Sequence, residues 1–143
     1  MSTFRAFRIS ASGLTAERLR MDIIANNLAN AETTRTPEGG PYRRQMPVFA
    51  PILEQAMRPS FSRTGQVGQG VRVVGIVSDS SEPRLVYDPQ HPDADADDYV
   101  AMPNVNVVQE MVDLISATRA YEANITALNA AKTMAQRSLE IGR

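Results

Sequence analysis

Apolar side chains recur every seven residues along the last forty positions, 104–143. One row consists of Val107, Leu114, Tyr121, Leu128 and Ala135, and a second row, four residues later in each repeat, of Met111, Thr118, Ile125, Lys132 and Leu139. Two such rows are typical of a helix that packs against another helix. Asn106, with Gln109 three residues later, predicts the helix start, and Gly142 its end. The helix is therefore roughly 55 Å long at about 1.5 Å per residue.

A second heptad pattern runs from about residue 4 to Asn30. It consists of Phe7, Leu14, Met21 and Leu28, with Phe4, Ala11, Arg18 and Ala25 three residues before each. This predicts an N-terminal helix about 40 Å long. Gly13 weakens a helix relative to alanine, which suggests close packing or a kink there. Asn26, Asn27 and Asn30 suit the helix exit, because asparagine side chains bond to nearby backbone and tolerate left-handed geometry.

The middle of the chain lacks a helical period, apart from a possible short turn over residues 52–58. Four strands are expected instead, at residues 44–49, 71–77, 85–87 and 99–102. Pro47 restricts the first strand to a sheet edge, and Gly65, Gly68, Gly70 and Gly75 supply turns or bulges. The predicted fold is mainly α with a small β-rich insert. Long helices within 1–31 and 103–143 pack as a coiled-coil-like pair, and 32–102 forms short strands and extended loops.

Pairing the two helices with each other still leaves apolar positions uncovered. We expect Ile23 and Ile24 on the first helix to stay exposed, and Val108, Val112, Ile115 and Met134 on the second. An exposed apolar stripe on a long helix indicates further protein partners. Helix stability comes mostly from packing, so the ends of an isolated chain should be poorly ordered. The pattern therefore predicts a structural protein that assembles with itself or with related subunits.

Composition narrows the possible functions further. The 143 residues carry a net charge of −1 and contain no cysteine and one histidine. The near-zero charge gives no general attraction to nucleic acid, and these counts exclude disulfides, thiolate sites and multi-histidine metal sites. No run of eighteen apolar residues and no cleavable secretory signal is present. Export, if it occurs, must use an uncleaved signal.

The candidate metal-binding and catalytic residues have simpler structural explanations. Asp93, Asp95 and Asp97 alternate as in a calcium loop, but the glycine and the bidentate glutamate of that loop are missing, so a turn built on aspartate side chains is favoured. His91 beside Asp88 resembles an acid–base pair, yet no nucleophile accompanies it.

The acidic stretch 79–98 and the arginine-rich N-terminal segment carry opposite charge, so the two are able to attract each other. Three heptad positions are occupied by Thr118, Lys132 and Arg18. They are either ordinary imperfections, with the charged ends of Lys132 and Arg18 extending into water, or they set the helix register or the number of partner helices.

Several longer motifs resemble those of a known family. Ser12-Gly13-Leu14, residues 20–30 and Thr33-Thr34 are similar to the N-terminal signature of bacterial flagellar axial proteins. Residues 40–45 with Val48-Phe49, residues 86–95, residues 99–100 followed by 103–108, and residues 110–124 resemble the proximal-rod members of the flagella basal body rod protein family. The matching family-motif residues are Asn26, Asn27, Asn30, Tyr87, Asp88, Pro89, His91, Pro92, Asn104 and Asn106. Asp98 departs from the pattern, because glycine is more usual before Tyr99, and residues 50–69 match little.

The resemblance implies a non-enzymatic structural subunit of the flagellar rod in the periplasm. It implies export through the flagellar type III apparatus without a cleaved signal, and terminal helices that form a tube around the export channel. The implied partners are further copies of the chain, FlgB, FlgF, FlgG and FliE homologues, the export apparatus and the membrane-ring protein, with no cofactor, metal, nucleic acid or small-molecule substrate. The expected assembly seam is Phe4, Phe7, Leu14, Met21, Ile24, Leu28, Val107, Met111, Leu114, Tyr121, Ile125, Leu128 and Leu139. The alternatives are a helical-hairpin adaptor or chaperone-like binding module, and an acid–base enzyme built on His91 and Asp88.

Overall fold

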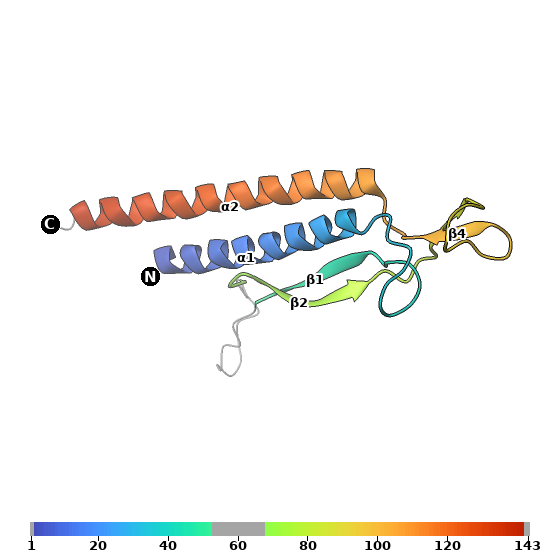
Figure 1. Ribbon diagram of the computed structural model, residues 1–143. Coiled ribbons are helices and arrows are strands. Elements are labelled where there is room, and N and C mark those ends of the chain that lie inside the picture. Colours follow the sequence, from blue (N-terminus) through green and yellow to red (C-terminus); the bar gives the residue numbers. More distant parts are fainter. Residues whose placement is uncertain (1, 53–67, 142–143) are drawn as a thin grey trace, which may run out of the picture.

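Two long antiparallel helices and two small hairpins make up the fold (Figure 1). The computed structural model describes residues 2–52 and 68–141. Its elements are α1 (Ser2–Ala29), β1 (Gln45–Pro51), β2 (Val71–Ser78), β3 (Arg84–Tyr87), β4 (Tyr99–Met102) and α2 (Val107–Ile141). The mainly helical fold with a small β insert is confirmed, and so are the four strands. The turn expected over residues 52–58 lies outside the described residues, apart from Ile52, whose backbone pairs with that of Gly70.

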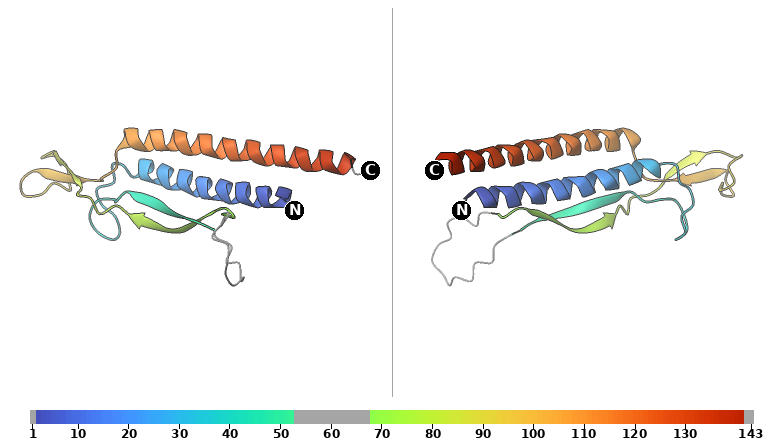
Figure 2. Two further views of the ribbon diagram at one scale, coloured as in Figure 1. Left: turned by 180° about the vertical axis from the view of Figure 1, so that it is seen from behind. Right: turned by 60° about the vertical axis from the view of Figure 1, so that its left-hand side comes forward.

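The helix α1 forms the middle layer of the molecule, with α2 on one side and the β1–β2 hairpin on the other (Figures 1 and 2). This corrects the expectation for Ile23 and Ile24, which are buried rather than exposed. Periodicity identified α2 as the partner of α1 but gave no sign that the hairpin covers its opposite side. Val108, Val112, Ile115 and Met134 on α2 are exposed, as predicted.

The two hairpins are both antiparallel. In the first, β1 pairs with β2, and the register shifts between Val48 and Phe49, whose partners are Gly75 and Val73. The irregularity leaves Val74 without a partner next to Gly75, and a bulge is one of the two roles expected for that glycine. Pro47 lies in a strand that has one hydrogen-bonded neighbour, as its missing N–H requires. In the second hairpin, β3 pairs with β4, and the rings of Tyr87 and Tyr99 meet edge to face with centroids 5.5 Å apart.

Close contact between the helices depends on small side chains. Ala117 and Ala131 of α2 are buried, and a Cβ added at Gly13 of α1 would lie 3.0 Å from Oδ1 of Asn124. The glycine therefore marks close packing, one of the two roles expected for it. None of the helices in the described residues is long and apolar enough to cross a membrane.

The turn that links β3 to β4 is organised by aspartate side chains and backbone bonds. Backbone N–H groups donate to the side-chain oxygens of Asp88 and Asp95, and the amide of Asp93 donates to Nδ1 of His91 over 3.1 Å. These bonds support the aspartate-turn interpretation of this stretch. Thr34 and Arg35 in the loop after α1 both bind the Asp93 carboxylate. That ion pair joins the N-terminal segment to the acidic segment, as their charges suggested.

Asp98 adopts the left-handed conformation, with φ of +63°. This explains why glycine suits the position before Tyr99, since a left-handed L-residue costs about 1–2 kcal/mol. We expect Asp98→Gly to leave the turn intact or to stabilise it by up to about 1 kcal/mol, and Asp98→Val to destabilise it by about 1–2 kcal/mol. The readout is hydrogen exchange at the amides of Asp88 and Asp95, which bond across the turn to the carbonyls of Asp98 and Tyr99. Equal exchange in both variants would contradict the conformational explanation.

Candidate assembly surface

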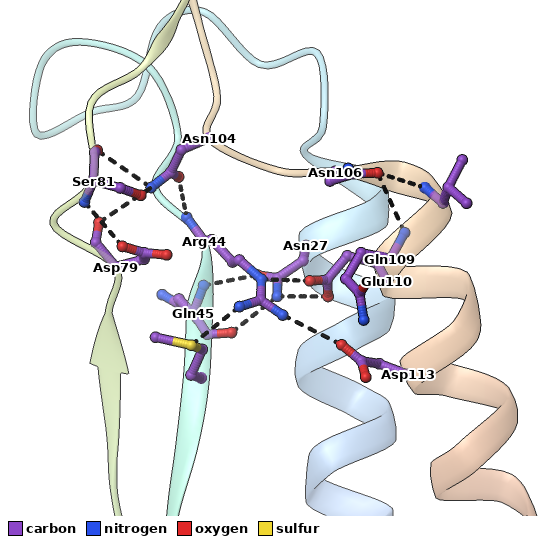
Figure 3. Close-up of polar contacts among 12 residues, drawn as sticks. Asn27, Arg44, Gln45, Asp79, Ser81, Asn104, Asn106, Gln109, Glu110 and Asp113 are labelled. Atoms are coloured by element: carbon purple, nitrogen blue, oxygen red, sulfur yellow. Dashed lines mark hydrogen bonds and ion pairs between the residues drawn. The ribbon is translucent and has the colours of Figure 1, made fainter.

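A buried polar cluster joins the two helices to the first hairpin (Figure 3). At its centre, Asn27 of α1 is 1% exposed and Glu110 of α2 is fully buried. Nδ2 of Asn27 donates to Oε2 of Glu110 over 3.0 Å and to the carbonyl of Gln45 over 2.9 Å. Its Oδ1 accepts hydrogen bonds from the Gln45 amide and the Tyr42 hydroxyl. The side-chain amide of Asn27 thus bonds at the same time to α2, to the start of β1 and to the loop that precedes β1.

Arg44 provides the positive charge for this cluster. Its Nε donates to Oε1 of Glu110, and its Nη2 lies 3.4 Å from Oδ2 of Asp113. Arg20 of α1 approaches the other carboxylate oxygen of Asp113 at 3.9 Å. A buried carboxylate is tolerated when it is both paired and hydrogen-bonded, which is the situation of Glu110. Burial, with a further contribution from the Glu110 charge, raises the pKa of Tyr42 and keeps its hydroxyl protonated as a donor.

Two asparagines from the expected family motif lie next to this cluster. Asn104 connects it to the segment before the second hairpin, and Asn106 caps α2. Oδ1 of Asn104 accepts from the amide of Arg44 over 2.8 Å, and its Nδ2 donates to Oγ of Ser81 over 2.9 Å. Oδ1 of Asn106 accepts from the amides of Val108 and Gln109 at the start of α2. The cap predicted for Asn106 is therefore confirmed. We call the set of Asn27, Arg44, Asn104, Glu110 and Asp113 the polar hub.

The other motif residues are structural parts of turns. Asn26 and Asn30 bond to each other at the end of α1, where Oδ1 of Asn30 also accepts from Thr33, as expected for a helix exit. His91, Pro89 and Pro92 lie in the β3–β4 turn with Asp88. Across the described residues, no group of three or more His, Asp or Glu side chains is arranged to hold a metal ion.

The structure separates the two heptad rows predicted for α2. Leu114, Tyr121 and Leu128 of the first row are half-buried. Met111, Ile125 and Leu139 of the second row are exposed, as is Val107 at the helix start. The expectation that both rows pack on the same helix is wrong for this second row. Its place against α1 is taken by Glu110, Ala117, Asn124 and Ala131, because small or hub-forming side chains allow closer approach than methionine or leucine.

The seam residues of α1 become more exposed towards its start. Phe4 is 78% exposed, Phe7, Leu14, Met21 and Leu28 are half-buried, and Ile24 is buried. Packing is thus densest beside the polar hub. On α2, exposed apolar side chains gather in the N-terminal third. We call this set the outer row: Val107, Val108, Met111, Val112 and Ile115. An exposed apolar group of this kind marks a site of protein contact.

Sequence reasoning did not identify the polar hub. Asn27 was predicted as a helix exit and as a family-motif residue, and Arg44 and Glu110 appeared only within longer motif stretches, with no role of their own. A signal was available at Glu110, which lies seven residues before Ala117 and is the only charged member of the row that faces α1. A charge on the inward face of a helix requires a partner. Arg44, 66 residues away, cannot be identified by local spacing.

Comparison with known proteins agrees with this architecture. The family model described as "Flagella basal body rod protein" matches residues 7–35, and "Flagellar basal body rod FlgEFG protein C-terminal" matches residues 96–141. These segments cover most of α1 and α2.

Relatives align over nearly the whole chain. The flagellar basal-body rod protein FlgC of Borreliella burgdorferi is 49% identical, over 99% of this chain and 98% of the relative. The FlgC proteins of Bacillus subtilis and Salmonella typhimurium are 48% and 41% identical over the full length of both chains. The chain belongs to the FlgC family of flagellar basal-body rod proteins and is a structural subunit of the rod.

Proposed function

We propose that this subunit forms part of the proximal rod in the periplasm, where its terminal helices build a tube around the export channel and transmit torque. Residues 1–31 and 103–143 supply the assembly core, and residues 32–102 face neighbouring subunits outside it. The observation that carries this proposal is the outer row, a group of five exposed apolar side chains near the start of a long helix of a rod-family protein. Sequence identity of 48–49% to rod proteins along the whole chain disfavours the adaptor alternative and supports a non-enzymatic role.

The partners that fit this role are further copies of the chain and the FlgB, FlgF, FlgG and FliE homologues, with the membrane-ring protein at the base. Passage through the type III export apparatus, without a cleaved signal, would deliver the subunit to the growing rod. The exposed seam residues Phe4, Ile125 and Leu139 suit contacts with such neighbours. Long helices offer many simultaneous contacts, as torque transmission requires.

The outer row provides a direct test. Val112→Asp combined with Ile115→Asp should abolish swimming in a flagellated host whose own copy is deleted, because both carboxylates would be buried without partners in the rod. Both side chains are exposed in the free chain, so its fold should be unchanged. Swimming in soft agar and immunoblots of isolated basal bodies measure the effect, and circular dichroism checks the fold.

The matched control adds the same charges elsewhere on α2. Thr126→Asp with Asn129→Asp alters two exposed polar positions, again three residues apart. This variant should keep more motility than the outer-row variant and enter basal bodies. Normal swimming of the Val112→Asp, Ile115→Asp variant would refute the assignment of the outer row to assembly.

A further inference from the structure

The two helices lie against each other in one alignment along their common axis, which we call the helix register. Asn27 of α1 meets Glu110 of α2 (Figure 3), and Gly13 lies against Asn124. Gly13 is 14 residues before Asn27, and Asn124 is 14 residues after Glu110. Each step back along α1 therefore matches one step forward along α2 over about four turns of both helices.

Small side chains alone do not determine this register. The residues of α2 that face α1 recur every seven positions, namely Glu110, Ala117, Asn124 and Ala131. Because of this repeat, sliding α2 by seven residues, about 10 Å at the α-helical rise, turns the same face towards α1. The buried alanines permit close approach in either alignment. They fix how closely the helices pack, but not where along each other they stop.

Asn27 distinguishes the observed register from both alternatives. Its side-chain nitrogen donates to Glu110 and to the carbonyl of Gln45, and its oxygen accepts from the amide of Gln45. A slip of seven residues in one direction would place Asn27 opposite Ala117, and a slip in the other direction opposite Pro103. Neither side chain can accept the hydrogen bond that Glu110 accepts. A buried polar group that loses its partner keeps the full cost of its desolvation.

Arg44 adds a second constraint. It lies directly before β1, which packs on α1, and it pairs with both Glu110 and Asp113 of α2. One slip would carry Glu110 past the end of α1. The other would bring Glu110 beside Arg20, which has the complementary charge, but would take both carboxylates away from Arg44. Among these alignments, only the observed one pairs Arg44 and Glu110 with each other.

We propose that the polar hub determines the helix register, so that the chain folds with one alignment of α1 and α2 instead of a mixture of alignments seven residues apart. Asn27 and Glu110 are the positioning residues of this device. Buried polar groups fix the register of some coiled coils in the same way, at a cost in stability. The inference concerns the free subunit and does not depend on its place in the rod.

The helix register also arranges the exposed apolar side chains of the subunit. Phe4 and Ile9 are exposed on α1, and the outer row is exposed on α2. A slip of seven residues would move the outer row by about 10 Å relative to α1, which is about the diameter of a helix. A subunit in the wrong register would therefore present these two groups at the wrong spacing.

An apolar hub tests the proposal. Asn27→Leu, Arg44→Met and Glu110→Leu together remove the buried amide and the ion pair. Replacing a buried ion pair by apolar side chains of similar volume is often neutral or stabilising. The full-length variant should therefore stay helical by circular dichroism, but it should occupy more than one helix register.

Distances between two spin labels measure the helix register. Ala25→Cys and Thr126→Cys place labels on exposed positions of α1 and α2, and the native chain has no competing cysteine. In the observed register Ala25 is level with Val112, so the labels are offset by 14 residues, about 21 Å along the axis. The chain with an intact hub should give this offset alone. With the apolar hub, about a tenth or more of the molecules should show a distance that is shorter or longer by about 10 Å.

Two controls separate the hub from other causes. Asn124→Ala keeps the hub and removes the tight contact with Gly13, and Glu110→Gln keeps hydrogen-bonding capacity without the charge. Both should keep the single distance. A helical apolar-hub variant that shows the native distance alone would overturn the proposal. Loss of its helical signal would overturn it too, because the hub would then be required for folding itself.

Disulfide trapping measures the same property in a milder variant, Asn27→Ala. Met21→Cys is combined in turn with Thr118→Cys, which reports the observed register, and with Met111→Cys or Ile125→Cys, which report slips of seven residues. Sδ of Met21 lies 3.6 Å from Oγ1 of Thr118. The other two pairs are offset by a further distance of about 10 Å, whereas a disulfide needs Cα atoms about 4–7 Å apart. After brief oxidation, Asn27→Ala should raise the share of the two slip products about threefold or more. An unchanged share would count decisively against the proposal.

Discussion

Glu110→Ala should lower the free energy of unfolding by about 3 kcal/mol, although it deletes a polar group. Glu110 is fully buried and accepts hydrogen bonds from Asn27 and Arg44. Removing one partner of a buried ion pair leaves the other charge uncompensated, which typically costs 3–5 kcal/mol. The low end applies because Arg44 is 24% exposed and keeps a contact with Asp113. Urea unfolding followed by circular dichroism measures the change.

The same helix provides the control. Glu122→Ala removes an exposed carboxylate from α2 and should change stability by less than about 0.5 kcal/mol. Glu110→Gln retains hydrogen-bonding capacity without the charge, so it should fall between Glu110→Ala and the native chain. A loss below about 1 kcal/mol in Glu110→Ala would show that the polar hub does not stabilise the junction of α1, α2 and β1.

Gly70→Ala should detach the first hairpin from α1 and cost about 2–4 kcal/mol. Gly70 has φ of +130°, a conformation that L side chains rarely adopt, and an added Cβ would lie 2.2 Å from Oγ of Ser12. Ser12 cannot easily move away, because its hydroxyl donates to the Ile9 carbonyl over 2.7 Å and accepts from the Val71 amide over 3.1 Å. Urea unfolding and proteolysis of β2 are the readouts.

Two further variants separate the causes of this effect. Gly75→Ala is the matched glycine control, since a Cβ there meets no atom within 4 Å, and it should cost far less. Gly70→Ala with Ser12→Gly relieves the steric clash but keeps the backbone strain, so it should recover only part of the loss. Equal stability of Gly70→Ala and Gly75→Ala would contradict the close approach of hairpin and helix.

The elements that could be predicted from sequence are those governed by local rules. Strand positions followed from β-branched residues between turn residues, and Asn106 was identified as a cap because its side chain bonds only two and three residues ahead. The position of Gly13 against α2 was one of two roles expected for it. Each of these signals lies within about one helical turn or one hairpin.

The three-layer arrangement was not predicted because it depends on distant contacts. Ile23 and Ile24 lie outside the two seven-residue rows predicted for α1, so periodicity did not show that both are buried in the folded chain. Likewise, the row containing Met111 and the row containing Glu110 are separated by one position on α2. Hydrophobicity alone favours the row that contains Met111. The row containing Glu110 packs on α1 because Glu110 forms hydrogen bonds with Asn27 and Arg44, which are 83 and 66 residues away.

The two ends of the helix pair therefore differ in how complete they are. Beside the polar hub, Ile23, Ile24 and Ala117 are buried and both helices have intramolecular partners. At the opposite end, Phe4 and Leu139 remain exposed, and α2 extends beyond α1. Helices without tertiary packing are marginal in water. In a free subunit the hub end should hold the helices together, and neighbouring subunits should complete the other end.

Hydrogen exchange on the free chain and on isolated basal bodies tests this central claim most directly. In the free chain, amides in residues 4–12 and 130–141 should exchange at least tenfold faster than those in residues 20–29 and 110–118. Assembly should slow exchange at these distal segments and leave the hub segments nearly unchanged. Equal protection of both ends in the free chain, or no added protection of the distal ends in the rod, would contradict the account.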